Sequence, residues 1–182
     1  MIKLLTNRLI IRDYNINDLD DYHRLLSDDK VMYYLQGIKT TNIKESKKEF
    51  MKVIKDQETQ RRNFYHFKIE DKETKTFIGS IGYTVIENTT YGKLVHMGYF
   101  ILEKYWNKGY TTEAVKRVIE FAFDENSVYR IQTGCFKENK NSEKIMQRCK
   151  FIKEAEFKEY TLHDGKLKDR VEYRLLKNEW NK

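Results

Sequence analysis

Apolar residues along the chain follow two patterns, short runs typical of strands and wider spacings typical of helices. The strand pattern occupies residues 7–14, 64–70, 76–87, 94–102 and 128–136, and it returns in a final pair, 151–162 and 169–180. The turn His163-Asp164-Gly165 lies between the last two strands. The helical pattern occupies residues 15–28, 42–57, 112–122 and 141–149. We therefore predict the order β-α-α-β-β-β-α-β-α-β-β.

This order predicts an α/β fold with one mixed sheet and helices on its faces. The run 94–102 is almost wholly apolar, which indicates a central strand. A helix separates it from 128–136, so these two strands are predicted to pair in parallel through a crossover. The chain has no internal repeat and no low-complexity linker, and we expect one domain over residues 1–182.

The composition narrows the choice of partners. Hydrophobic residues make up 40% of the chain, and 35 Lys+Arg against 28 Asp+Glu give a net charge of +7. A basic chain attracts polyanions such as nucleic acid or a phosphorylated small molecule. Here, however, Lys and Arg alternate with acidic residues and form no stripe. A nucleic-acid-binding protein is therefore the weaker alternative.

The cellular location can be predicted from targeting signals and from the cysteines. No apolar run approaches the roughly 18 residues of a membrane span, and the charged N-terminus does not resemble a signal peptide. Cys135 and Cys149 alone make no disulfide framework. The four histidines share no metal-ligand spacing with these cysteines. We expect a cytoplasmic protein with no membrane partner and no metal.

The stretch YWNKGYTTEAV, residues 105–115, leads from a strand into a helix through one glycine. Amides at a helix N-terminus lack intrahelical partners, and the helix dipole there favours anions. A glycine before the helix lets the backbone approach a phosphate closely. The amides that can wrap a pyrophosphate belong to Asn107, Lys108, Gly109, Tyr110, Thr111 and Thr112. Taken alone, this stretch also fits an ordinary strand-to-helix corner.

Four blocks in order resemble the GNAT superfamily of N-acetyltransferases, and in particular its RimJ/RimL-like branch of ribosomal-protein N-terminal acetyltransferases. The blocks are LLTNRLIIRDYNINDLDDY, TFIGSIGY, HMGYFILEKYWNKGYTTEA and NKNSEKIMQRCKF, and the resemblance extends over about residues 6–180. It implies the GNAT acyl-CoA N-acyltransferase fold, in which strands 94–102 and 128–136 splay apart. It also implies an acetyl-CoA-dependent enzyme.

The resemblance assigns roles on the acetyl-CoA side. The loop from Asn107 to Thr112 corresponds to the superfamily loop that holds the pyrophosphate of acetyl-CoA. Backbone amides near Ile101 and Leu102 would hold the pantetheine arm and polarise the thioester. Thr111 stands where glycine or alanine is frequent, which matters little if the amides do the binding.

The resemblance also implies residues for the acetyl-transfer step, and each of them has an alternative role. Asn139 and Ser142 would face the cofactor, with Ser142 assisting the departing thiolate, although either residue also fits a helix cap. His96 stands where the branch more often has Glu, so it is the candidate base. A packed or surface histidine is the alternative. Met146 stands where many GNAT enzymes place a tyrosine, so this helix supplies no phenol as an acid.

Two departures affect the backbone. Asn107 replaces a usual glycine, and asparagine tolerates a positive φ better than most residues. Lys150 stands where the branch usually has glycine after the last short helix. A left-handed lysine there would cost about 1 kcal/mol relative to glycine.

The acceptor remains open between a protein N-terminus and a small amine such as a polyamine or an aminoglycoside. Acidic runs at 17–21 and 27–29 border the acceptor by resemblance and would suit a cation, but acids near helix N-termini are also dipole partners. A non-catalytic CoA-binding module is the other alternative. The sequence leaves the oligomeric state open, with a homodimer as one option.

Overall fold

The computed structural model describes residues 1–180, so the last two residues of the predicted domain lie outside the described part. The strands are β1 (Lys3–Leu5), β2 (Leu9–Asp13), β3 (Phe64–Asp71), β4 (Phe77–Thr89), β5 (Gly92–Ile101), β6 (Val128–Phe136), β7 (Ile152–His163) and β8 (Lys166–Leu176). The helices are α1 (Leu19–Leu26), α2 (Ile43–Asp56), α3 (Tyr110–Glu120), α4 (Lys140–Arg148) and α5 (Lys177–Trp180). The predicted elements are present, and β1 is an addition that the pattern did not predict. The last predicted strand, 169–180, was too long at its end, because β8 stops at Leu176 and residues 177–180 form α5.

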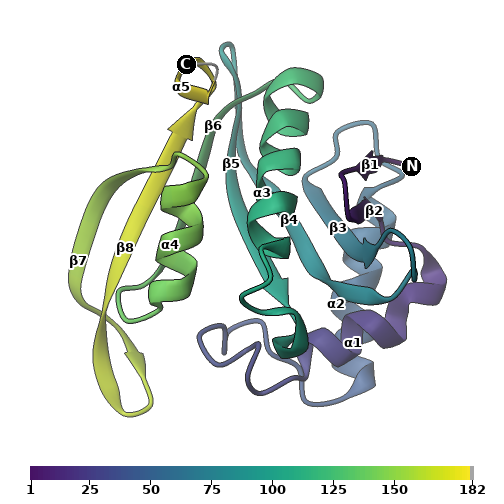
Figure 1. The fold of residues 1–182 in the computed structure, drawn as a ribbon, viewed down its shortest axis with the longest axis horizontal. Coiled ribbons are helices and arrows are strands. Elements are labelled where there is room, and N and C mark those ends of the chain that lie inside the picture. Colours follow the sequence, from purple (N-terminus) through teal and green to yellow (C-terminus); the bar gives the residue numbers. More distant parts are fainter. Residues whose placement is uncertain (181–182) are drawn as a thin grey trace.

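One mixed sheet carries the fold, as predicted. Its eight strands lie in the order β1-β2-β3-β4-β5-β6-β8-β7 (Figure 1). Neighbouring strands pair antiparallel except β5 and β6, which pair in parallel across α3. The predicted crossover and the central place of β5 are therefore confirmed. The last strand, β8, returns between β6 and β7.

Helices cover both faces of the sheet. Helices α3 and α4 lie in front of the sheet in Figure 1. The apolar face of α3 is fully buried against Val95, Met97 and their neighbours on the sheet. Helices α1 and α2 pack with each other through a second cluster that includes Tyr22 and Phe50, and Phe100 of β5 packs against this cluster. Since Phe100 and Met97 lie on opposite faces of β5, the two cores are on opposite sides of the sheet.

The parallel pairing of β5 and β6 is short. It runs from Lys93↔Val128 to His96↔Gln132, although β5 continues to Ile101 and β6 to Phe136. Beyond this point the two strands diverge, as Figure 1 shows. The resemblance had implied this splay, and the structure confirms it. A slot therefore opens at the centre of the sheet.

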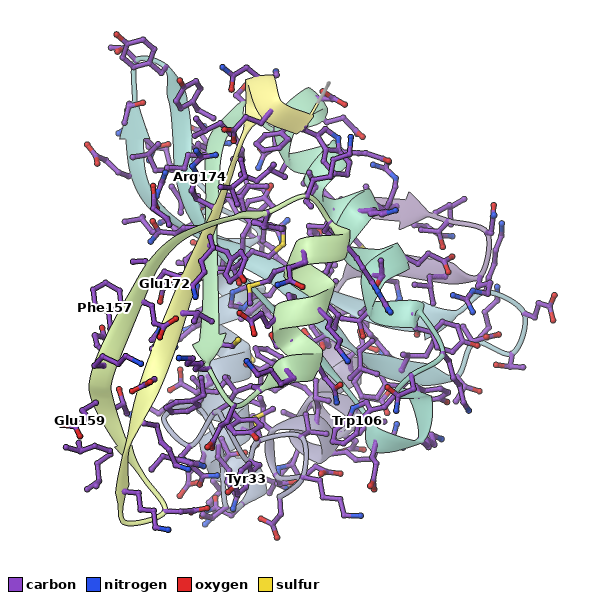
Figure 2. All side chains as sticks on the ribbon, turned by 60° about the vertical axis from the view of Figure 1, so that its left-hand side comes forward. Tyr33, Trp106, Phe157, Glu159, Glu172 and Arg174 are labelled. Carbon is purple, nitrogen blue, oxygen red and sulfur yellow. The ribbon has the colours of Figure 1, made fainter. Side chains whose placement is uncertain are left out.

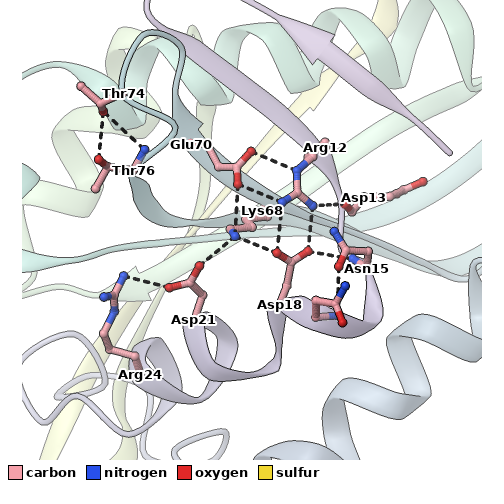
Figure 3. A network of polar contacts seen from close by, with 11 residues as sticks. Arg12, Asp13, Asn15, Asp18, Asp21, Arg24, Lys68, Glu70, Thr74 and Thr76 are labelled. Atoms are coloured by element: carbon pink, nitrogen blue, oxygen red, sulfur yellow. Dashed lines mark hydrogen bonds and ion pairs between the residues drawn. The ribbon is translucent and has the colours of Figure 1, made fainter.

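A buried network of charges joins β2 and β3 to the start of α1 (Figure 3). Asp18 lies 2.7 Å from a guanidinium nitrogen of Arg12 and 2.7 Å from Nζ of Lys68. Glu70 pairs with both cations, and Asp21 pairs with Lys68 at 2.8 Å. The acidic run 17–21 thus stabilises the fold through Asp18 and Asp21. Our suggestion that this run would serve a cationic acceptor is wrong for these two carboxylates, because they face internal cations.

Candidate active site

A single large cleft of about 1610 Å³ follows the slot through the described part of the molecule. The start of α3 and the start of α4 line one side of the cleft, together with residues 96–101 of β5. The loop between α1 and α2, the face of α2 and the strand β4 line the other side. Both faces of β5 line the cleft, with His96 and Phe100 on one face and Met97 and Tyr99 on the other.

The loop before α3 has the backbone that an anion site needs. Asn107 and Gly109 both adopt positive φ, 57° and 80°, and Gly109 is the N-cap of α3. The Glu113 amide donates to the Gly109 carbonyl at 3.1 Å, so intrahelical bonding begins there. The amides of residues 110–112 precede that bond and have no intrahelical acceptor. The predicted loop is thus a left-handed turn that leads into a helix N-terminus.

Arg8 fixes this loop from outside the cleft. Its guanidinium donates to the Lys108 carbonyl at 3.0 Å, forms an ion pair with Glu113 at 2.7 Å, and lies 4.4 Å from the ring centroid of Tyr110. Glu113 also accepts from the hydroxyl of Thr6 at 2.6 Å. Although burial opposes it, these hydrogen bonds hold the pKa of Glu113 below its usual range. Glu113 therefore anchors the loop, in the structural role that the sequence favoured over a base.

The backbone of β5 corrects one predicted residue. The Leu102 amide donates to the Ile78 carbonyl on β4 at 3.0 Å, so it is not free for a pantetheine arm. Because successive residues of a strand direct their amides to opposite edges, the Ile101 amide faces the slot. The Ile101 carbonyl accepts from the Trp106 indole at 2.6 Å. Ile101 stays a candidate, and Leu102 does not.

The start of α4 separates the two roles that the sequence left open for Asn139 and Ser142. The Asn139 side-chain oxygen accepts from the Ser142 amide at 3.2 Å, so Asn139 is the helix cap. The Ser142 hydroxyl instead lies 3.0 Å from the hydroxyl of Tyr99 on β5. Met146 is fully buried in the core. The phenol near Ser142 thus comes from a strand, and no sequence signal had identified it.

His96 occupies the last position at which β5 pairs with β6. Its side chain is exposed in the cleft, on the face opposite to Tyr99. Partial desolvation lowers the pKa of His96, and nearby Arg170 lowers it further, while Glu172 acts in the other direction. Figure 2 shows Glu172 on β8, the strand that follows β6 in the sheet. These surroundings favour the neutral imidazole.

The other histidines have structural surroundings, as predicted. His23 Nδ1 lies 2.8 Å from the Ser46 hydroxyl and joins α1 to α2. Burial, assisted by the charge of Arg62, lowers the pKa of His66 to about 4. Within residues 1–180, no group of three or more His, Cys, Asp or Glu side chains is placed to hold a metal ion.

Aromatic side chains close one end of the cleft. Tyr33, from the loop between α1 and α2, donates to Asp164 at the β7–β8 turn at 2.5 Å (Figure 2 labels Tyr33). The rings of Tyr33 and Phe136 lie 4.8 Å and 5.1 Å from the His163 ring, centroid to centroid. Tyr34 packs against Phe136 at 5.7 Å. This end of the cleft is lined by flat, largely uncharged surfaces.

The carboxylates that line the cleft are already engaged. Asp29 pairs with Lys39 at 2.6 Å, and Glu49 pairs with Lys52 at 2.7 Å. Glu45 accepts from a backbone amide at 2.7 Å beside the start of α2. Among the described residues that line the cleft, these are the only acidic ones. The cleft thus presents little uncompensated negative charge.

A family model for the acetyltransferase (GNAT) domain matches residues 8–152. The chain belongs to the GNAT acetyltransferases. The uncharacterized N-acetyltransferase p20 of Bacillus licheniformis is 29% identical over 180 residues, which cover 99% of each chain. The [ribosomal protein uS5]-alanine N-acetyltransferase of Escherichia coli is 28% identical over 116 residues, 64% of this chain and 59% of that one.

Solved structures agree in fold. The spermidine N-acetyltransferase of Vibrio cholerae, in complex with CoA and spermine, has a TM-score of 0.85 at 19% identity and covers 97% of this chain and 100% of its own. RimL, the ribosomal L7/L12 α-N-protein acetyltransferase in complex with CoA, has a TM-score of 0.84 at 18% identity and covers 96% and 98%. This GNAT chain is an N-acetyltransferase with acetyl-CoA as its donor, rather than a non-catalytic binding module. No helix within residues 1–180 is long and apolar enough to cross a membrane.

Proposed function

We propose that this GNAT enzyme transfers the acetyl group directly from acetyl-CoA to the N-terminal amine of a protein, with both substrates bound in the slot between β5 and β6. One observation carries the proposal. A histidine and a serine hydroxyl line the same slot but lie on opposite faces of the sheet. This arrangement suits a reaction in which the amine enters from one face and the thiol leaves on the other.

The donor side fits the charge of acetyl-CoA. Amides of Asn107, Lys108 and residues 110–112 surround the N-terminus of α3, where the helix dipole favours a pyrophosphate. Lys144 and Arg148 of α4 are exposed and line the same cleft. Sequence analysis did not single out these two residues, although their spacing of four places them on one helix face. We assign them to the phosphates of the donor.

The chemical step uses groups from both faces. The amine nitrogen attacks the thioester carbonyl, and His96 accepts a proton from that nitrogen. The Ile101 amide faces the slot and supports the carbonyl oxygen as charge develops on it. As the carbon–sulfur bond breaks, the sulfur keeps the electron pair and takes the hydroxyl proton of Ser142. His96 then returns its proton to solvent.

Direct transfer is favoured over an acyl-enzyme. Cys135 lines the cleft, but burial raises the pKa of its thiol to about 11. Since the thiolate is the nucleophilic form, Cys135 is almost wholly unreactive near neutral pH. Cys149 is buried, and the pKa of its thiol is raised in the same way.

Charge in the cleft favours an N-terminal amine over a polyamine. A polyamine presents several cations and needs several carboxylates, but the acidic side chains of the cleft are engaged by cations and amides. Lys48 and Arg170 line the cleft as well. The aromatic rings at Tyr33, Tyr34 and Phe136 instead suit the uncharged body of a peptide.

A release assay tests this choice of acceptor. CoA release from acetyl-CoA would be followed with peptides that begin with Ala, Ser or Met, and with spermidine and an aminoglycoside. Mass spectrometry would locate the acetyl group. We expect the highest kcat/KM for a peptide, with the acetyl group on its α-amine. A preference for spermidine would contradict the proposed acceptor but not the proposed site.

A further inference from the structure

Tyr99 joins the two edges of the slot. It lies on β5 three residues beyond His96, where pairing with β6 ends, and its side chain points to the face that α4 covers. Its hydroxyl oxygen is 3.0 Å from Oγ of Ser142 and 3.2 Å from the Ser142 carbonyl oxygen. The remaining contacts of the ring are with the apolar core below α3 and α4.

The phenol is a permanent donor. Burial raises the pKa of Tyr99 far above neutrality, and the hydrogen bond to Ser142 only partly opposes this. Tyr99 therefore keeps its proton throughout the reaction and does not itself act as the acid. Its one hydrogen can go to the Ser142 carbonyl or to Oγ of Ser142, and between the two hydroxyls the distance allows either oxygen to be the donor.

The other hydrogen bonds of Ser142 indicate which of its two oxygens, the carbonyl or Oγ, accepts from the Tyr99 phenol. Its carbonyl lies in the first turn of α4, where the amide four residues later donates to it. Its own amide is satisfied by the cap, Asn139. If the phenol donates to Oγ, the Ser142 hydroxyl hydrogen points away from Tyr99, towards the cleft that both residues line and where the Cys135 thiol also contacts this hydroxyl.

We propose that Tyr99 is a positioning residue for acetyl transfer. Its phenol donates to Oγ of Ser142 and directs the Ser142 hydroxyl hydrogen towards the departing sulfur. The same hydrogen bond stabilises the Ser142 oxygen as its proton moves to sulfur, and solvent restores that proton before the next turnover. This proposal rests on the proposed role of Ser142 in the reaction.

The test compares Tyr99→Phe, Ser142→Ala and the double variant, with the peptide that the acceptor panel selects. Tyr173→Phe is a matched control, because the Tyr173 phenol is also buried and contacts α4, at Glu143 Oε1, 3.0 Å away. We expect Ser142→Ala to lower kcat about a hundredfold. Tyr99→Phe should lower kcat about tenfold, the size of one lost hydrogen bond. The KM for acetyl-CoA should stay within about twofold in both.

The double variant separates positioning from a structural role. We expect it to be as slow as Ser142→Ala and no slower, because Tyr99 acts only through that hydroxyl. Tyr173→Phe should keep the parental kcat. Melting temperatures measured alongside would show that Tyr99→Phe and Tyr173→Phe lose comparable stability.

Each contrary outcome has a distinct meaning. If Ser142→Ala is slow while Tyr99→Phe keeps the parental kcat, the positioning proposal is overturned and the role of Ser142 stands. Losses that multiply in the double variant also overturn it. If Ser142→Ala keeps its rate, the proposed role of Ser142 fails, and the Tyr99 proposal fails with it. If no amine in the panel is acetylated, the proposed function itself is contradicted.

Discussion

We expect His96 to set the pH dependence of the reaction rate. A protonated imidazole cannot accept a proton, so the rate should fall as the pH drops through the pKa of His96. Because desolvation lowers that pKa, opposed only in part by Glu172, the fall should lie below about pH 6.5, the usual value for histidine. We expect His96→Gln to remove this fall and to slow kcat/KM about a hundredfold.

The measurement is kcat/KM for a peptide acceptor between about pH 5 and pH 9. The ionisation of the amine adds its own slope, which should persist in His96→Gln. His23→Gln is a suitable control, because His23 lies between α1 and α2, bonded to Ser46, away from the slot. If His96→Gln keeps the parental rate and profile, His96 is not the base.

Lys150 carries a backbone cost that a single substitution should relieve. It follows α4 with a φ of 63°, a conformation that glycine adopts without strain. We expect Lys150→Gly to raise the free energy of unfolding by about 1 kcal/mol, as measured in urea. The Kd of acetyl-CoA should not change. A loss of stability would show that contacts of the lysine side chain outweigh the backbone strain.

Single residues also show what the sequence can reveal. Asn107 and Lys150 were expected in left-handed conformations because glycine is usual at both positions, and both have positive φ. Local backbone demands of this kind are legible in the sequence. The contact between Tyr99 and Ser142 spans 43 positions and depends on how far β5 diverges from β6. The residues around Tyr99 and Ser142 do not show how far the two strands diverge, so the sequence did not predict the contact.

At the scale of elements, the N-terminus of α3 should control donor affinity. Gly109 has a φ of 80°, and a Cβ there would lie 3.4 Å from Nη2 of Arg8, the side chain that fixes the loop, so valine should strain the backbone and displace the loop amides proposed to hold the pyrophosphate. We expect Gly109→Val to raise the Kd of acetyl-CoA at least about tenfold, by isothermal titration. Gly165→Val is the matched control. It imposes similar strain, at a φ of 69°, in the β7–β8 turn with open space around it.

The control makes this comparison decisive. Both variants should lose stability, because valine is strained at a positive φ. Only the variant at position 109 should lose affinity for acetyl-CoA. If the two variants bind acetyl-CoA equally well, the loop before α3 does not hold the pyrophosphate.

The charge network between β2, β3 and α1 should make stability sensitive to acid. Burial alone would raise the pKa of Asp18, but hydrogen bonds from Arg12, Asn15 and Lys68 hold it at about 2. A lowered pKa stabilises the folded state above the unfolded value of about 3.9, and that stabilisation is lost as the pH falls towards 2. The shift corresponds to about 2 kcal/mol.

Urea unfolding at several pH values checks this expectation. Asp18→Asn should be less stable than the parent at pH 5, and the difference should narrow by about 2 kcal/mol as the pH approaches 2. Asp20→Asn, at an exposed position of α1, should follow the parent throughout. A difference for Asp18→Asn that is constant with pH would contradict the assigned pairing.

The bounds of single elements were predicted better than the way the elements pair with one another in the sheet. Strand β6 begins and ends at the predicted residues, 128 and 136, because the polar runs ENS (125–127) and KENK (137–140) border it on both sides. The three-residue strand β1 is too short to show a period. The insertion of β8 between β6 and β7 is a tertiary choice that the pattern of either strand does not encode. The acidic run 17–21 was misassigned for the same reason, since Lys68 of β3, which pairs with both Asp18 and Asp21, lies 50 residues from Asp18.

For the whole molecule, the splayed sheet explains how one slot serves two substrates. In the proposed mechanism, helices α3 and α4 hold the donor with amides and cations, and the aromatic rings of the loop after α1 contact the acceptor. His96 and Ser142 lie on opposite faces of the sheet, and in the proposed mechanism His96 faces the amine and Ser142 faces the departing sulfur. In this mechanism the acetyl group passes directly between the two substrates, and no acyl-enzyme intermediate forms.

Initial-rate kinetics test this central claim most directly. CoA release would be measured while acetyl-CoA and the selected peptide are varied together, with mass spectrometry of the enzyme after incubation with acetyl-CoA alone. Direct transfer predicts double-reciprocal lines that intersect, and an enzyme that carries no acetyl group. Parallel lines together with an acetylated enzyme would contradict it.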